Sequence, residues 1–162
     1  MNNRIEKIRA KRAEIDEQVR RIENERERNI KYYTERIMAL APRLRELHDV
    51  AIECVENKIP LGNMTYLHGS PHYPEFESEW WYHRTGFVRK GNDVFFGKIG
   101  GGCCGENLLI NKNGVIITNP LDVIIGTRTY ERAYFDFCDK CKSFLDAFDD
   151  FEKRFYNYID NL

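Results

Sequence analysis

The stretch that decides the fold is residues 129–162, TYERAYFDFCDKCKSFLDAFDDFEKRFYNYIDNL. Its apolar side chains recur at spacings of four and three residues, which is the period of one face of an α-helix. The members of this seam are Tyr130, Tyr134, Phe137, Cys141, Phe144, Phe148, Phe151, Phe155, Tyr158 and Leu162. Eight of these ten are aromatic, which is too much apolar surface for a solitary helix. We therefore expect a C-terminal helix over 129–162 that packs on a β-sheet or on the N-terminal helices.

The β-sheet is expected immediately upstream, over residues 80–128, as four to five antiparallel strands. Two hairpins are predicted, Trp80–Val88 with Val94–Ile99 and Asn107–Asn111 with Val115–Thr118. The second hairpin encloses Asn113-Gly114, a strong hairpin signal because both residues tolerate positive φ. Val123–Ile125 is a candidate fifth strand. The Pro- and Gly-containing residues 59–79 are expected to be a loop, and 59–162 one compact unit.

Residues 1–58 are expected to be a helical, coiled-coil-like segment. A first apolar series is Met1, Ile5, Ile8, Ile15, Val19 and Ile22, with Arg12 in the missing seam position. After Arg26 the spacing slips by one residue, which in a coiled coil is a stutter. A helix over residues 3–41 would be about 57 Å long, so part of it must project or pair with another chain. As interface residues this pattern predicts Ile15, Val19, Ile22, Ile30, Tyr33 and Ile37.

Pro42 interrupts the second apolar series. Proline breaks a helix interior but is accepted at a first helical position. The sequence therefore predicts either a kink at Ala41 or a new helix from Pro42 to about Lys58. The fold class that we expect is α+β, with a long helix at each end of an antiparallel sheet.

Composition and charge indicate where the protein is found and which kinds of partner its overall charge does not favour. The formal net charge is −1, so no global field attracts nucleic acid or anionic lipid. The cysteine count of five is odd, the N-terminus turns charged at once, and no apolar run approaches the roughly 18 residues that span a bilayer. We expect a cytoplasmic protein in a reducing compartment, with no membrane partner.

Two cysteine motifs could carry chemistry. Cys138-Asp-Lys-Cys141 matches C-x-x-C, but it lies about two turns inside the aromatic helix, away from the N-terminus that would lower a thiol pKa. Two thiols that pack as small hydrophobic groups are the favoured interpretation. The glycine-rich stretch 100–105 is either a wide inter-strand loop or a binding loop, whose candidate residues are Gly101, Gly102, Cys103 and Cys104. With His68, His72 and His83 nearby, zinc is an alternative there, although the spacing does not favour it.

Basic and aromatic residues alternate over residues 80–98, a pattern that could stack bases and neutralise phosphates. The candidate contacts to nucleic acid, or to a protein partner, are Trp81, His83, Arg84, Arg89, Lys90 and Lys98. Strand alternation places aromatic residues on both faces, and one face must be core. Ordinary sheet packing with exposed basic residues is therefore the favoured interpretation.

The sequence carries no catalytic signature, and we expect neither catalytic residues nor a metal or cofactor. The leading hypothesis is a non-catalytic protein that binds a larger partner, or a second copy of itself as a homodimer, through its long amphipathic helices. By analogy of composition alone, it would be a phage or mobile-element accessory factor that inhibits a host protein. The alternatives are a single-stranded nucleic-acid-binding protein that uses the basic aromatic sheet, and a zinc or thiol site at the Gly-Cys loop.

Overall fold

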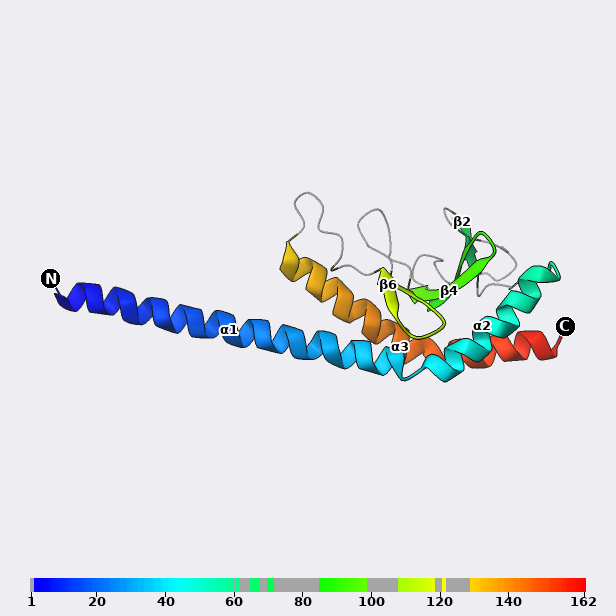
Figure 1. The fold of residues 1–162 in the computed structure, drawn as a ribbon, viewed down its shortest axis with the longest axis horizontal. Helices are drawn as coiled ribbons and strands as arrows, with labels where there is room; N and C mark the ends of the chain where they lie inside the picture. Colours follow the sequence, from blue (N-terminus) through cyan, green and yellow to red (C-terminus); the bar gives the residue numbers. More distant parts are fainter. Residues whose placement is uncertain are drawn as a thin grey trace. The chain divides into compact units, whose positions relative to one another are not determined.

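The computed structural model describes residues 2–59, 61, 65–67, 70–71, 85–98, 108–118, 121 and 129–162. These residues form an α+β arrangement with a long helix near each end, which confirms the predicted fold class (Figure 1). The helices are α1 (Asn2–Met38), α2 (Ala41–Glu56) and α3 (Tyr130–Asp160). The strands are β1 (Thr65–Leu67), β2 (Ser70–Pro71), β3 (Thr85–Lys90), β4 (Asp93–Lys98), β5 (Leu108–Ile110) and β6 (Ile116–Thr118).

The chain divides into two compact units, residues 1–32 and residues 33–162. The boundary lies inside α1, and α2 belongs to the second unit together with the sheet and α3. Of the two predictions at Pro42, the new helix is confirmed, because α1 ends at Met38 and α2 begins with Pro42 in its first turn. The ring there removes an N–H that a first turn would leave unbonded in any case.

Strands β3, β4, β5 and β6 form an antiparallel sheet in chain order. Both predicted hairpins are present, β3 with β4 and β5 with β6. Within the segment expected to be a loop, β1 pairs parallel to β3, and β2 extends the same edge. The candidate fifth strand, Val123–Ile125, lies outside the described residues.

The β5–β6 turn is closed by Asn111, whose side-chain oxygen accepts hydrogen bonds from the backbone N–H groups of Asn113 at 2.9 Å and Val115 at 3.0 Å. Gly114 follows with φ of +76°, a conformation that glycine adopts without a steric penalty. A Cβ at this position would lie 2.8 Å from Cα of Met38 and 2.9 Å from the carbonyl oxygen of Ile37. The hairpin tip therefore rests directly on the backbone of the last turn of α1.

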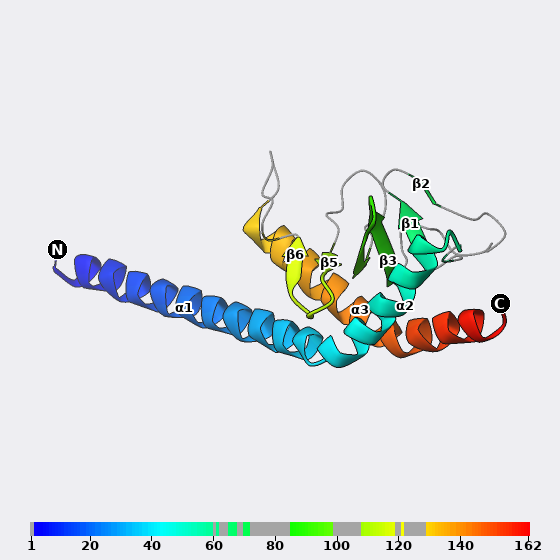
Figure 2. The same ribbon diagram turned by 45° about the vertical axis from the view of Figure 1, so that its right-hand side comes forward.

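The core of the second unit lies between the sheet and helices α2 and α3, which cover one face of it (Figure 2). Phe87 of β3 packs against Phe151 and Phe155 of α3, with ring centroids 5.0 and 4.7 Å apart. The middle of the predicted α3 seam is buried, whereas Tyr130 and Leu162 at its ends are exposed. The aromatic seam thus gains its burial from the sheet, as the amount of apolar surface in it requires.

The opposite face of the sheet also carries apolar side chains. Val88 and Leu109 are buried there, with Phe95 packed against them. Gly97 lies between these residues, and a Cβ added to it would collide with the carbonyl oxygen of Leu108. Strand alternation therefore separates Phe87 and Arg89, on the helix-covered face, from Val88 on the other.

Candidate helix–helix interface

The first unit is a helix with one apolar stripe. The stripe consists of Ile5, Ile8, Ile15, Val19 and Ile22, whose exposed fractions are 41, 70, 42, 46 and 49%. Spacings of three and four residues place these side chains on one face. Glu, Lys and Arg fill most other positions, and these residues form helices at little cost in side-chain entropy. The result is a row of large aliphatic side chains in contact with solvent.

Ion pairs within the helix connect charged residues along this unit. Lys11 pairs with Glu14, and Arg20 and Arg21 both pair with Glu17, at N–O distances between 2.8 and 3.3 Å. Their side chains are at least 45% exposed, so each pair contributes at most a fraction of 1 kcal/mol to helix stability. Burial of the stripe could add much more, since each fully buried Ile or Val side chain is worth roughly 1.5–3 kcal/mol.

The six predicted seam residues of α1 divide into two groups. Ile15, Val19 and Ile22 are exposed, Ile30 and Tyr33 are half-buried, and Ile37 is fully buried. The division coincides with the slip in spacing after Arg26. The first group is exposed together with Ile5 and Ile8, which precede it on the same face.

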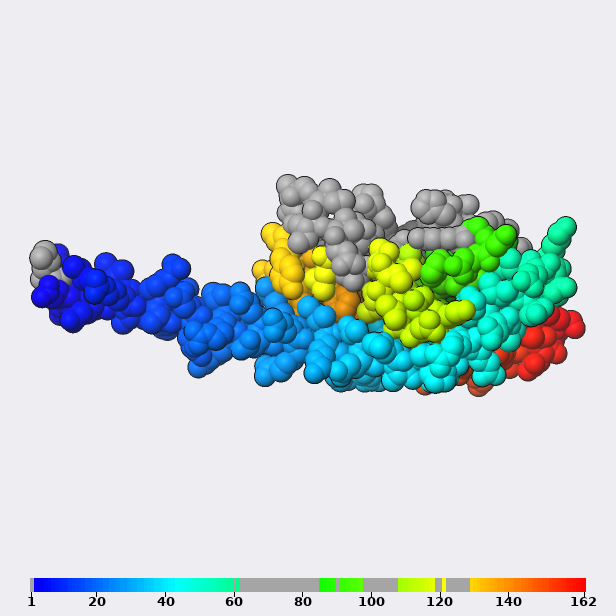
Figure 3. Space-filling view, in the orientation of Figure 1, coloured from blue at the N-terminus to red at the C-terminus, as the bar shows by residue number. Residues whose placement is uncertain are grey.

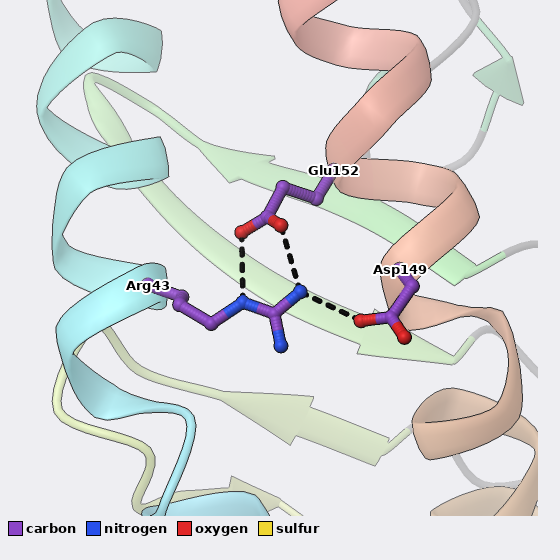
Figure 4. Close-up of polar contacts among 3 residues, drawn as sticks. All are labelled: Arg43, Asp149 and Glu152. Atoms are coloured by element: carbon purple, nitrogen blue, oxygen red, sulfur yellow. Dashed lines mark hydrogen bonds and ion pairs between the residues drawn. The ribbon is translucent and has the colours of Figure 1, made fainter.

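Within the second unit, Arg43 connects α2 to α3 (Figure 4). Its Nε and Nη2 atoms donate to the two carboxylate oxygens of Glu152 at 3.0 and 2.7 Å, and Nη2 also donates to Asp149 at 2.6 Å. The guanidinium also lies over the Phe148 ring, 4.7 Å from its centroid. The hydrogen bonds that Arg43 donates to Glu152 and Asp149 raise the pKa of its guanidinium further above the ordinary value, so the guanidinium remains charged at every physiological pH. In the space-filling view the cyan surface of α2 adjoins the red last turns of α3 (Figure 3).

The geometry indicates that the Arg43 network fixes two helices rather than binding a ligand, because both carboxylates already accept its donors. This network could not be predicted from the sequence, because 109 residues separate Arg43 from Glu152 and no local pattern relates them. The same holds for His48, which is buried on α2 and whose Nε2 lies 3.7 Å from an Asp93 carboxylate oxygen at the start of β4.

The described thiols are poorly suited to redox chemistry. Burial raises the pKa of Cys141 to about 12, with Cys138 contributing, and also raises the pKa values of Cys138 and Cys54. The thiolate is the nucleophilic form, so a raised pKa suppresses reactivity at neutral pH. Cys141 is fully buried and Cys138 is half-buried, so these two thiols are packed among other side chains. The described residues also contain no group of three or more His, Cys, Asp or Glu side chains placed to bind a metal ion.

Most candidate residues of the two alternative functions lie outside the described residues. These are Trp81, His83, Arg84, Gly101, Gly102, Cys103 and Cys104, together with His68 and His72. Lys90 and Lys98 are placed on β3 and β4 as backbone only. Arg89 donates from Nε to the carbonyl oxygen of Gly91 at 2.9 Å and so braces the β3–β4 turn. The nucleic-acid and zinc hypotheses remain predictions.

No family model, curated protein or solved structure matches this chain. Among the described residues, no helix combines the length and apolar character that crossing a membrane requires.

Proposed function

We propose that this chain is a non-catalytic protein that associates with another protein chain through the apolar stripe of α1. One observation carries the proposal: five aliphatic side chains share one face of a helix and are each at least 41% exposed. In proteins most helical stability comes from packing an apolar face against another element. A second helix laid along the stripe would supply that cover, as in helix-in-groove and coiled-coil recognition.

The test uses the full chain and two matched substitutions. Ile15 lies on the stripe, and Ala13 is exposed on the opposite side of the same helix. Both substitutions, Ile15→Gln and Ala13→Gln, introduce glutamine, a good helix former, and only Ile15→Gln removes a side chain from the stripe. Because glutamine forms helices less well than alanine but better than isoleucine, helix propensity alone would disfavour the control more than the test variant. We expect Ile15→Gln to weaken association in sedimentation equilibrium at least tenfold, and Ala13→Gln to leave it unchanged.

Sedimentation equilibrium detects self-association. If the chain is monomeric in that experiment, it is next used as bait to capture a partner protein. A partner that binds the wild-type chain and the Ile15→Gln variant equally well would refute the proposal. A partner identified in this way would also test the expectation that the chain inhibits a host protein. The alternative of nucleic-acid binding is refuted if the chain does not bind single strands at about 50 mM salt.

A further inference from the structure

The charged residues on either side of the stripe are distributed unevenly along α1. In a heptad that assigns Ile5 to position a and Ile8 to position d, the flanking e and g positions are basic in the first half and acidic in the second. The basic set is Arg4, Arg9 and Lys11, and the acidic set is Asp16, Glu23 and Glu25. All six side chains are exposed. The stripe is therefore bordered by a positive half followed by a negative half.

We propose that the occupant of the stripe is a second copy of this chain, whose α1 lies antiparallel to the first. This proposal rests on the proposed function and adds the partner, its direction and its register. With the partner's Ile22 opposite Ile5, the partner's Val19 lies opposite Ile8 and the partner's Ile15 opposite Arg12. Four of the five aliphatic residues of the stripe then face another aliphatic residue, and Ile15 faces the partner's Arg12. The contact is isologous, as expected of a two-fold symmetric dimer.

In this register the flanking charges are complementary. Antiparallel coiled coils juxtapose e with e and g with g, so Arg9 faces the partner's Asp16 and Arg4 faces the partner's Glu25. Each attraction occurs twice because of the two-fold symmetry. Lys11 faces the uncharged Gln18 of the partner subunit, so no like charges oppose one another at these positions.

A parallel, in-register dimer is disfavoured by the same residues. Parallel helices juxtapose g with the e position of the next heptad, which brings Arg4 against the partner's Arg9 and Lys11 against the partner's Asp16. One pair repels and the other attracts, so the larger cost of the parallel form lies at the a positions. Parallel pairing also stacks identical a positions, so Arg12 and Arg26 each meet their own copy inside the seam. Like charges at such positions are a recognised means of selecting against an orientation.

The seam between Ile5 and Arg26 covers about three heptads, near the lower limit for a stable coiled coil. Its d positions are three β-branched isoleucines, and arginine occupies position a at residues 12 and 26, so the interface is short and interrupted. We therefore expect a reversible dimer whose population depends on protein concentration.

The substitution Arg9→Glu distinguishes the two orientations, because it should weaken an antiparallel dimer and strengthen a parallel one. In the antiparallel dimer the substitution places one carboxylate, at residue 9, opposite another, that of the partner's Asp16. This repulsion occurs twice in the symmetric dimer, so association weakens about tenfold. In a parallel dimer the same change replaces the Arg4–Arg9 repulsion with an attraction, and association tightens. Lys7→Glu is the matched control, since Lys7 points away from the seam and its replacement alters net charge equally.

Sedimentation equilibrium of the full chain provides the measurement, with Arg9→Glu/Asp16→Arg as the rescue variant. We expect the rescue variant to recover most of the wild-type affinity, less a small loss because Asp16 also pairs with Arg12 of its own helix at 3.1 Å. Tighter association of Arg9→Glu, or a wild-type chain that stays monomeric, would overturn the antiparallel pairing. Neither outcome would refute helix-mediated association itself, which fails only if Ile15→Gln changes no binding.

Discussion

Replacing Gly114 with alanine tests the contact between the β5–β6 turn and the end of α1. Two effects add at this position. Alanine at a φ of +76° costs about 1 kcal/mol relative to glycine. Its methyl group would also lie 2.8 Å from Cα of Met38, and because the obstacle is backbone, the hairpin itself must shift. Overpacking of this kind costs about 2 kcal/mol more.

Gly91 in the β3–β4 turn is the matched control. Its φ is +62°, so alanine meets a similar conformational cost, but a Cβ there has no heavy atom of the described residues within 4 Å. We expect Gly91→Ala to lower the unfolding free energy by about 1 kcal/mol and Gly114→Ala by about 3 kcal/mol. For a unit of this size these losses correspond to decreases in Tm of roughly 4 °C and 12 °C.

Near-UV circular dichroism during thermal and urea unfolding is the appropriate assay, because it reports the packed aromatic core. Combining Gly114→Ala with Met38→Ala should give no rescue, since the collision is with main-chain atoms. Equal losses of stability in the Gly91 and Gly114 variants would refute the close approach of the hairpin to α1.

Three further predictions concern the second unit and are measured by urea unfolding. Asn111→Ala should lower the free energy of unfolding by about 1 kcal/mol, because two backbone N–H groups lose their acceptor. Asn113→Ala, the control, should lower it by less than about 0.5 kcal/mol, and similar losses for the two variants would contradict the turn geometry. Glu152→Gln should lower the free energy of unfolding by about 1 kcal/mol, and Asp149→Asn should lower it by less. The reason is that the side chain of Glu152 is 23% exposed and that of Asp149 is 85% exposed. The reverse order would refute the bidentate role of Glu152. Tyr156→Phe should raise stability at pH 7 by about 1 kcal/mol, because the buried hydroxyl has no hydrogen-bond partner among the described residues. Burial, and then Glu46 and Glu152, raise the pKa of Tyr156 to about 12. As the pH rises, the unfolded chain therefore loses the hydroxyl proton before the folded chain does. Wild-type stability should consequently fall between about pH 10 and 12 more steeply than that of Tyr156→Phe.

The elements that sequence could predict are those whose signal is local or periodic. The α3 seam repeats over eight turns, so its buried middle follows from spacing alone. In the β5–β6 turn Gly114 alone of the Asn-Gly pair has a positive φ, and this conformation, which glycine adopts at no steric cost, is what the sequence signal reflects. Periodicity does not report where a seam stops being covered, and so Tyr130 and Leu162, exposed at the two ends, were assigned to it with the rest.

The parts that sequence did not predict depend on distant partners. Strands β1 and β2 have three and two residues, too few for alternation to be recognised, and the pairing of β1 with β3 is parallel and non-local. The Arg43 network joins side chains that only the packing of α2 on α3 brings together. Of the candidate interface, the sequence predicted the stripe through its spacing, but it could not show that Ile37 is buried while Ile15 is exposed.

That difference follows from where each residue lies along α1, and not from its face of the helix. Val19 and Ile37 are eighteen residues apart, which is five full turns at about 3.6 residues per turn, so both lie on the same face. Ile37 belongs to the second unit and is fully buried, whereas Ile15 belongs to the first unit and is 42% exposed. The stripe offered by Ile5–Ile22 therefore ends before the part of the helix that the core covers. Ile15→Gln can test association without disturbing the second unit, because Ile15 contributes no buried side chain to that core.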